Sequence, residues 1–259
     1  GEGIQAKPLL QKFKIPALNY STAWELLQPP VDYMFLPFGS YKLDCAVVME
    51  YIAAVHKGPR APKVGLLTYN NAYGRSIHEP SKEYVKGKNI EIVSIEEFPP
   101  QTVDLTTELL RLKQKGAQYV FMQMLPAAII STLKGADRIG YKPMFIGTWT
   151  STDPDFFKNG KGLLRDRVKM QFCGALPSDN VPGMKIMKEL WMRYKTVDSF
   201  DTAYWEGVVV GMIMERAFLR AKEKYGQVNP GNIATAMETF RNEDFGGLVP
   251  NITYTKEDH

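Results

Sequence analysis

The chain has 259 residues, of which 44% are hydrophobic, and its 32 basic and 28 acidic residues are well mixed, so the net charge is only +4. This composition suits a soluble chain with one large α/β domain or two modest lobes. It provides no basic tract of the kind that follows a phosphate backbone, which argues against a nucleic-acid partner. No window approaches eighteen consecutive apolar residues, so the sequence predicts no membrane-spanning helix.

The start of the sequence and the cysteines add two expectations. The chain opens without methionine and without the apolar stretch of a signal peptide, and residues 3–18 are typical of a helix already under way, so we expect a processed or truncated product.

Cys45 and Cys173 are too far apart in the sequence for a local metal site or redox pair. We expect two free buried thiols, with a disulfide between them as the alternative.

The first 150 residues alternate between short apolar strands and amphipathic helices. Residues 63–69 are a nearly continuous apolar run, which is typical of a parallel strand covered on both faces. The alternation predicts a parallel, doubly wound sheet. The expected strands are 15–20, 33–38, 63–69, 90–98, 119–124 and 144–149, and the expected helices are 41–58, 74–87, 102–116 and 126–140.

The pattern changes near residue 173. Residues 168–176 are a further expected strand, and three expected helices follow it with no strand between them, at 182–196, 202–226 and 229–240. Helices of this kind need a sheet to cover, and the simplest candidate is the N-terminal part. We therefore expect the chain to leave one lobe, build a second and return to the first.

Ligands of doubly wound sheets bind at the carboxyl ends of the strands, so the residues after each strand are candidates for a site. After strand 15–20, Thr22 and Glu25 fit the S/T-x-x-E capping box, which predicts a helix N-terminus suited to an anion. The alternative is that Ser21 and Thr22 only cap a helix.

The stretch LLTYNNAYGRS, residues 66–76, is the second candidate. Asn70 or Asn71 can cap the following helix, Gly74 allows a tight turn, and Tyr73 then lies on the rim of the sheet. The alternative is a solvated loop tyrosine with no ligand.

Two further strand ends carry large or polar side chains. Gln123, Met124 and Leu125 stand at the end of strand 119–124, where methionine and leucine are more often core than pocket. Trp149 and Thr150 stand at the end of strand 144–149. A large ring there either packs under a loop or forms a wall for an apolar ligand.

Motifs of covalent catalysis and metal binding are absent from the sequence. It contains no G-x-S-x-G, H-E-x-x-H, G-x-x-x-x-G-K-[ST] or G-x-G-x-x-G motif, and none of its three histidines lies at an expected strand end. The acids Asp153 and Asp155 are better read as the first turn of a helix than as an acid/base pair. We expect no catalytic residue, no metal and no cofactor.

Four segments together resemble a known family. They are residues 15–27, 63–76, 103–116 and 118–149, and they are similar to the type I periplasmic binding proteins of the leucine/isoleucine/valine-binding family, the extracellular ligand-binding receptors that serve ABC importers. The most specific parts are the Ala72-Tyr73-Gly74 turn, the block at 104–117 and the A-D-R-I-G-Y turn.

The resemblance implies two doubly wound parallel-sheet lobes joined by three crossover strands. The crossovers are expected near residues 37–40, after residue 173 and near residues 246–250. Compared with the family, the first lobe lacks its opening strand–helix units. Lobe 1 is expected to comprise residues 1–38 and 178–246, and lobe 2 residues 39–177 and 247–259.

The resemblance also implies a set of ligand-binding residues. The segment that binds the ligand carboxylate in the family corresponds to Tyr20, Ser21 and Thr22, and the tyrosine that reaches across the cleft corresponds to Tyr73. The further ligand contacts correspond to Gln123, Met124, Leu125, Trp149 and Thr150. Where amino-acid binders of the family hold an acid against the ligand ammonium, this sequence has Trp149. A buried ammonium needs a paired anion, so we expect a ligand without a free amine unless Asp153 reaches back.

The function expected from the resemblance is a periplasmic or other extracytoplasmic substrate-binding component of an ABC importer. It would clamp a small carboxylate-bearing ligand by hinge closure, act as a monomer and present its closed form to a permease in the membrane. The ligand would be a branched-chain or aromatic amino acid, or a related organic acid or amide. Two alternatives are a ligand-sensing regulatory domain of the same fold, like the amide sensors, and a small-molecule hydrolase or isomerase working through Asp153 and Tyr73.

Overall fold

The computed structural model describes residues 2–152, 154–160, 162–194 and 202–259, which form two compact units. Unit 1 comprises Gly1–Ser40 and Cys173–His259, and unit 2 comprises Tyr41–Phe172. The chain therefore enters unit 2 and leaves it close to two of the expected crossovers. None of the helices in the described part of the chain combines the length and the apolar character needed to span a bilayer.

Unit 2 is built on a five-stranded, wholly parallel sheet with strand order β4-β3-β5-β6-β7. Strand β3, which lies between β4 and β5, is buried along all but its first residue, as the apolar run predicted. The expected strands at 144–149 and 168–176 are shorter in the structure. The bounds are β3 Lys63–Tyr69, β4 Glu91–Phe98, β5 Tyr119–Gln123, β6 Met144–Gly147 and β7 Val168–Met170.

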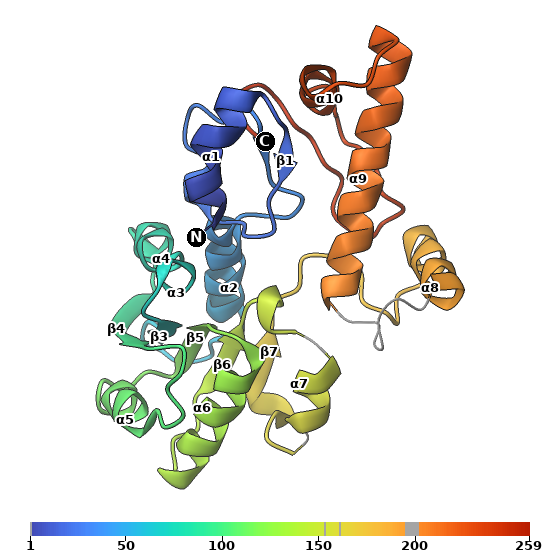
Figure 1. Ribbon diagram of the computed structural model, residues 1–259. Helices are drawn as coiled ribbons and strands as arrows, with labels where there is room; N and C mark the ends of the chain where they lie inside the picture. The colour runs from blue at the N-terminus through green and yellow to red at the C-terminus, as the bar shows by residue number, and fades with distance from the viewer. Residues whose placement is uncertain (1, 153, 161, 195–201) are drawn as a thin grey trace. The chain divides into compact units, whose positions relative to one another are not determined.

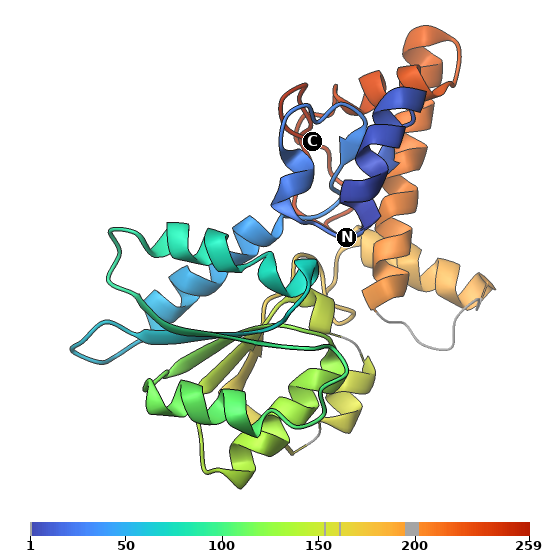
Figure 2. The same cartoon turned by 60° about the vertical axis from the view of Figure 1, so that its left-hand side comes forward.

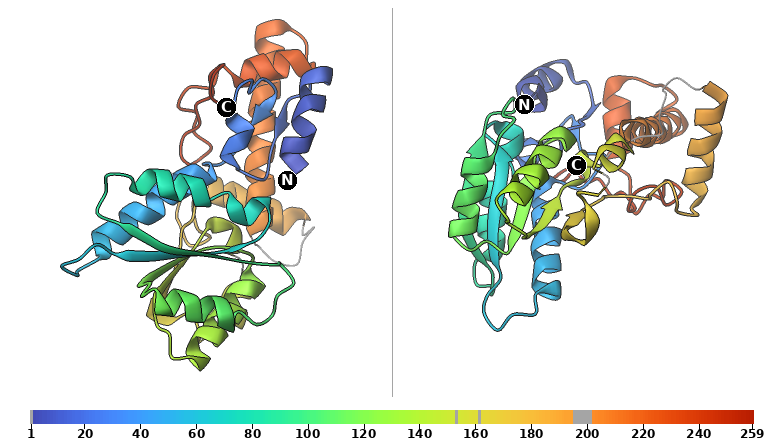
Figure 3. Two further views of the ribbon diagram at one scale, coloured as in Figure 1. Left: turned by 90° about the vertical axis from the view of Figure 1, so that its left-hand side faces the viewer. Right: turned by 90° about the horizontal axis from the view of Figure 1, so that it is seen from below.

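Helices cover both faces of this sheet, as the doubly wound pattern requires. Figure 2 and Figure 3 show α2 and α4 on one face and α5 and α6 on the other. The core between the sheet and the α5/α6 layer contains Leu109 and Leu112 of α5 and Ile129 and Leu133 of α6, all without solvent exposure. The bounds are α2 Tyr41–Val55, α3 Ala72–Arg75, α4 His78–Val85, α5 Thr106–Gln114, α6 Pro126–Arg138 and α7 Pro154–Asn159, with short 3-10 turns at η2 Trp149–Ser151 and η3 Arg165–Arg167.

The turn from β3 into α3 depends on an asparagine and a glycine. The Asn71 side chain caps α3 by accepting a hydrogen bond of 2.9 Å from the backbone N–H of Gly74, as expected for one of the two asparagines. Gly74 packs directly on the end of β3, where an added Cβ would lie 2.0 Å from the carbonyl oxygen of Tyr69. Only glycine allows this close backbone approach. The apolar run therefore breaks because the chain must turn tightly over its own strand.

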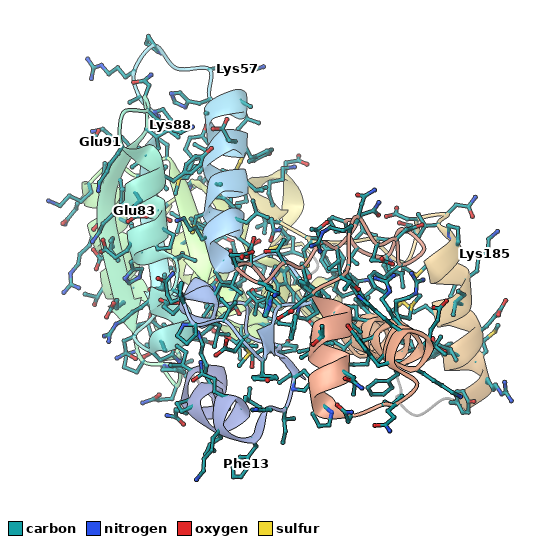
Figure 4. All side chains as sticks on the ribbon, turned by 90° about the horizontal axis from the view of Figure 1, so that it is seen from above. Phe13, Lys57, Glu83, Lys88, Glu91 and Lys185 are labelled. Atoms are coloured by element: carbon teal, nitrogen blue, oxygen red, sulfur yellow. The ribbon has the colours of Figure 1, made fainter. Side chains whose placement is uncertain are left out.

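The N-terminal part of unit 1 contains helix α1 Glu2–Phe13 and a two-stranded parallel sheet of β1 Ala17–Leu18 and β2 Met34–Phe35. Between the strands lies the 3-10 helix η1 Trp24–Leu27. The Lys7 ammonium of α1 donates to the carbonyl oxygen of Leu26 at 2.9 Å and so ties α1 to η1. Phe13, at the end of α1, points away from the ribbon in Figure 4 and is 60% exposed.

The described C-terminal part of unit 1 contains the helices α8 Pro182–Tyr194, α9 Thr202–Tyr225 and α10 Pro230–Met237, at positions close to those expected. Figure 1 shows α10 beside the C-terminal half of α9. Glu243, which follows α10, accepts hydrogen bonds from Arg216 at 2.7 Å and from Arg220 at 2.6 Å, both on α9. These ion pairs join α9 to the chain that follows α10.

The last thirteen residues lie in unit 1, whereas the expected division placed residues 247–259 in lobe 2. The Tyr254 hydroxyl donates to the carbonyl oxygen of Leu36 at 2.8 Å, and the His259 ring stacks on Phe35 with centroids 4.0 Å apart. The ring of Tyr254 also packs on Phe240. Aromatic packing against β2 thus holds this segment in unit 1.

Neither Cys45 nor Cys173 forms a disulfide. Cys45 is buried in α2, and burial raises the pKa of its thiol to about 12. Cys173 is half-buried and is the first residue of unit 1 after the chain leaves unit 2.

The Gly74 turn makes a direct stability prediction. We expect Gly74→Ala to lower the free energy of unfolding by about 2–4 kcal/mol, because the new methyl group collides with backbone atoms that cannot move aside. Gly211→Ala, in the exposed middle of α9 with open space at its Cβ, is the control and should be stabilising by about 0.5–1 kcal/mol. Urea denaturation followed by circular dichroism measures both, and equal stabilities for Gly74→Ala and the parent protein would contradict the prediction.

Candidate functional site

Polar side chains from three strand ends of unit 2 form one hydrogen-bonded chain. The Tyr73 hydroxyl lies 2.5 Å from Thr150 Oγ1, which lies 3.0 Å from Thr148 Oγ1. Thr148 in turn donates to Gln123 Oε1 at 2.8 Å. These residues follow or end β3, β5 and β6, whose carboxyl ends share one edge of the sheet. The structure therefore brings together three expected site residues, Tyr73, Gln123 and Thr150. We refer to these three and Thr148 as the polar chain.

The amide of Gln123 has an unused donor. The side chain is without solvent exposure, and its Nε2 has no hydrogen-bond partner among the described residues. Leaving a buried donor unpaired costs about 1–3 kcal/mol. A carbonyl or carboxylate oxygen, or a water molecule, would satisfy it, so the polar chain can offer a hydrogen bond to an acceptor.

Tyr73 is held by aromatic neighbours as well as by Thr150. Its ring makes an edge contact with Tyr41 at 5.8 Å and a tilted contact with Tyr69 at 6.4 Å. Burial raises the pKa of the Tyr73 hydroxyl to about 12, and hydrogen bonds with the nearby threonines limit the rise. The hydroxyl is therefore protonated at neutral pH and acts as a hydrogen-bond donor or acceptor.

The apolar candidates from the same strand ends lie in different surroundings. Met124 and Trp149 are without solvent exposure, whereas Leu125 is 52% exposed. Met124 belongs to the core under the α5/α6 layer, and its carbonyl oxygen accepts a hydrogen bond from the Ser151 hydroxyl. The expected strand 144–149 includes Trp149, but β6 ends at Gly147. Trp149 lies instead in the 3-10 turn η2 that follows.

The remaining candidates, Tyr20, Ser21 and Thr22, lie in unit 1. The expected capping box does not form, because the N-cap of the four-residue η1 is Ala23 and no side chain caps it. Thr22 is instead fully buried, and its Oγ1 has no hydrogen-bond partner among the described residues. Tyr20 is 57% exposed.

A second polar cluster supports the loop that carries Tyr73. Thr68 Oγ1, at the end of β3, lies 2.8 Å from Nε2 of His78, the first residue of α4. The other ring nitrogen of His78 lies 3.6 Å from the carboxylate of Glu97, which also receives two hydrogen bonds from Arg75, at 2.9 and 2.7 Å. The cluster therefore connects β3 and α4, which flank the segment that carries Tyr73, with Glu97 on β4.

Two residues at this edge escaped the sequence reasoning. Thr148 was counted within an expected strand, although it is the residue directly after β6. Asp44 lies on the apolar face of α2 and is 1% exposed. Burial raises the pKa of Asp44 to about 7. The signal for Asp44 was an acid at helical spacing from Tyr41 and Val48 on a buried face.

Among the residues that the structure describes, no group of three or more His, Cys, Asp or Glu side chains is arranged to hold a metal ion. Asp153, the acid of the expected hydrolase alternative, lies outside the described residues. The polar chain itself consists of hydroxyl and amide groups, which are suited to hydrogen bonding.

A family model matches almost the whole chain. The model of a family described as "Periplasmic binding protein" matches residues 2–259. Among curated proteins, "Leu/Ile/Val-binding protein homolog 8" of Brucella abortus is 29% identical over 90 residues, and "homolog 7" of the same organism is 27% identical over 135 residues. These matches cover 35% and 51% of this chain, but only 22% and 34% of the relatives.

Solved structures match over a larger share of their length. A "branched chain amino acid ABC transporter" of Thermus thermophilus "with bound valine" has a TM-score of 0.87 and 26% identity, covering 99% of this chain and 69% of its own. A "fatty acid ABC transporter substrate-binding protein" of Thermomonospora curvata has a TM-score of 0.85 at 19% identity, covering 96% of this chain and 64% of its own, and that likeness concerns the fold alone.

The cluster around His78 makes a prediction about pH. Burial lowers the pKa of His78 in the folded protein, with Glu97 acting in the opposite direction. As the pH falls, His78 of the unfolded chain therefore binds its proton before His78 of the folded protein does. The contribution of His78 to the free energy of unfolding should be fully present above about pH 6.5 and should be lost as the pH falls below it. In His78→Gln, which can still hydrogen-bond Thr68 but cannot titrate, this loss should be absent. Denaturation of both proteins across the pH range measures the difference, and curves that run parallel would contradict the assignment.

Proposed function

Because the chain belongs to the periplasmic binding protein family, we propose that it is the substrate-binding component of an ABC-type importer. It acts outside the cytoplasm, binds a small carboxylate-bearing ligand without covalent chemistry, and closes its two lobes on that ligand by a hinge movement. A permease in the membrane then recognises the closed form. The ligand is a branched-chain or aromatic amino acid, or a related organic acid or amide.

The observation that carries this proposal is the polar chain with its unused Gln123 donor. It lies at the carboxyl edge of a doubly wound sheet, the place where ligands of such sheets bind. Its hydroxyl and amide groups are suited to a carboxylate, carbonyl or hydroxyl oxygen. In this proposal Gln123 and Tyr73 hydrogen-bond the ligand, Leu125 and Trp149 face its apolar part, and Tyr20, Ser21 and Thr22 contribute from unit 1.

The printed ligands of the similar structures are consistent with a small acid. One is bound to valine, and the other is named as a fatty acid transporter component. Both ligands join a carboxylate to an apolar chain, and they differ in the amine. The amine is therefore the feature of the ligand that most needs an experiment.

Binding without turnover fits the state of Tyr73 better than enzymatic chemistry does. A tyrosine acting as a general base must lose its proton near the working pH, but burial raises the pKa of Tyr73 to about 12. The family and the structurally similar proteins are likewise substrate-binding proteins. This supports a receptor in preference to a hydrolase or isomerase.

The ligand class is tested by a matched pair of small acids. Valine and 3-methylbutanoate share the carboxylate and the branched chain and differ only in the ammonium group. A ligand that binds only the folded state adds about 2.7 kcal/mol of stability at 100 times its Kd, which raises the melting temperature. We expect stabilisation by 3-methylbutanoate to exceed that by valine, because none of the acids that the structure describes is hydrogen-bonded to the polar chain. Stabilisation by valine alone would show that a carboxylate pairs with the ammonium, and no stabilisation by either acid would reject the branched-chain members of the proposed ligand class.

The role of Gln123 is tested by a substitution with a matched control. Gln123→Leu keeps the size of the side chain and removes the donor, so it should weaken binding of the preferred acid about tenfold. The control is Gln114→Leu, at the exposed end of α5, where the chain leads toward the opposite end of β5. Isothermal titration calorimetry compares the two, and equal affinities would remove Gln123 from the site.

A further inference from the structure

The hydrogen bonds of the polar chain all run in one direction. Thr148 donates its hydroxyl proton to Gln123 Oε1 at 2.8 Å, and a threonine hydroxyl has only one proton to give. The 3.0 Å contact between Thr148 Oγ1 and Thr150 Oγ1 therefore needs the proton of Thr150. Because that proton is then used, the 2.5 Å contact between Thr150 Oγ1 and the Tyr73 hydroxyl needs the proton of Tyr73. Each hydroxyl thus donates toward Gln123.

This direction decides what each end of the polar chain can offer to a ligand. The Tyr73 hydroxyl gives its proton to Thr150, so the group that remains at this end is an oxygen lone pair, which is an acceptor. At the other end, Gln123 accepts through Oε1, and its Nε2 has no partner among the described residues. The polar chain therefore ends in an acceptor at Tyr73 and in a donor at Gln123.

Burial makes the direction difficult to reverse. Gln123 and Thr148 are without solvent exposure, whereas Tyr73 and Thr150 are half-buried. A buried hydroxyl that turns away from its acceptor loses a hydrogen bond that bulk water does not replace. Reversal would need the hydroxyls and the amide to turn together. The chemical character of the two ends is thus set before a ligand arrives.

We propose that the direction of the polar chain selects a small hydroxy acid as the ligand. The ligand carboxylate accepts a hydrogen bond from Gln123 Nε2, and the ligand hydroxyl donates one to the Tyr73 oxygen. This inference rests on the proposed function and narrows it, because it makes a neutral hydrogen-bond donor a required feature of the ligand. An ammonium group would also donate, but it needs a paired anion when buried, and none of the described acids is hydrogen-bonded to the polar chain.

The first experiment compares acids that differ only in the donor. Fluorine is close to a hydroxyl group in size but carries no proton, so it leaves the Tyr73 oxygen without a donor. Calorimetry measures the binding of 2-hydroxy- and 2-fluoro-3-methylbutanoate, and of 3-hydroxy- and 3-fluoro-3-methylbutanoate. We expect the hydroxy acid of at least one pair to bind about tenfold more tightly than its fluorinated partner. Fluorinated acids that bind as tightly in both pairs would overturn the proposal.

The role of Tyr73 in this preference is measured with Tyr73→Phe. This variant keeps the ring and removes the acceptor, so the hydroxy and fluorinated acids should bind it with equal affinity. A preference that persists in Tyr73→Phe would assign the ligand hydroxyl to another acceptor and overturn the proposal. If none of the four acids binds the parent protein, the hydroxy-acid ligand and the branched-chain members of the proposed ligand class are both rejected, and the direction of the polar chain is decided by the second experiment.

The second experiment tests the direction without a ligand. It follows the Cζ resonance of Tyr73 in protein labelled with carbon-13 at this atom of its tyrosines, because the carbon that carries the hydroxyl responds to whether that group donates or accepts. The chain has 13 tyrosines, and Tyr73→Phe identifies the resonance by its loss. Thr148→Val removes the acceptor of the Thr150 proton. Thr150 should then donate to Tyr73 instead, and the Tyr73 resonance should shift.

Two further variants control for changes in packing. Thr148→Ser keeps the hydroxyl and should leave the Tyr73 resonance at its parental position. Thr132→Val removes a buried hydroxyl outside the polar chain, which donates to the carbonyl oxygen of Ala128, and should also leave the resonance unchanged. An unchanged resonance in Thr148→Val would mean that Thr150 already donates to Tyr73, and it would overturn the direction. An equal shift in Thr148→Ser would overturn it as well, because the shift would then come from packing.

Discussion

Parallel pairing of the strands is the constraint on which the functional edge of unit 2 depends. Because β3 pairs in the same direction with β4 on one side and β5 on the other, and β6 continues the pattern, the residues that follow these strands meet at one edge. Tyr73 and Thr150 are thus within hydrogen-bond distance although 77 positions separate them in the sequence. Parallel sheets of this kind require apolar strands covered on both faces, which the run at 63–69 provides.

Features set by local sequence were predictable, and those set by packing were not. The bounds of β3 agree with the apolar run, and Asn71 caps the next helix, because both depend on neighbouring residues. Thr22 and Glu25 match a capping box, but η1 has only four residues and its cap is Ala23. A capping motif cannot lengthen a helix whose surroundings do not support it.

The candidate site shows the same division. Tyr73, Gln123 and Thr150 could be placed at strand ends from the alternation of strands and helices, and the structure joins them in one chain of hydrogen bonds. Thr148 could not, because the sequence alone does not show that β6 ends at Gly147 and leaves this residue beyond the strand. The place of segment 247–259 also depends on distant residues, because aromatic contacts with Phe35, which no local pattern encodes, hold it in unit 1.

The two cysteines differ in a way that has a practical use. Maleimides and similar reagents attack the thiolate, so Cys45, buried and with its pKa raised to about 12, is protected from them at neutral pH. Cys173 is half-buried and lies where the chain returns from unit 2 to unit 1. Without any engineering, the chain thus offers one preferred point for attaching an environment-sensitive dye. That point lies on the connection between the units, where a dye would report a change in their arrangement as a change in fluorescence.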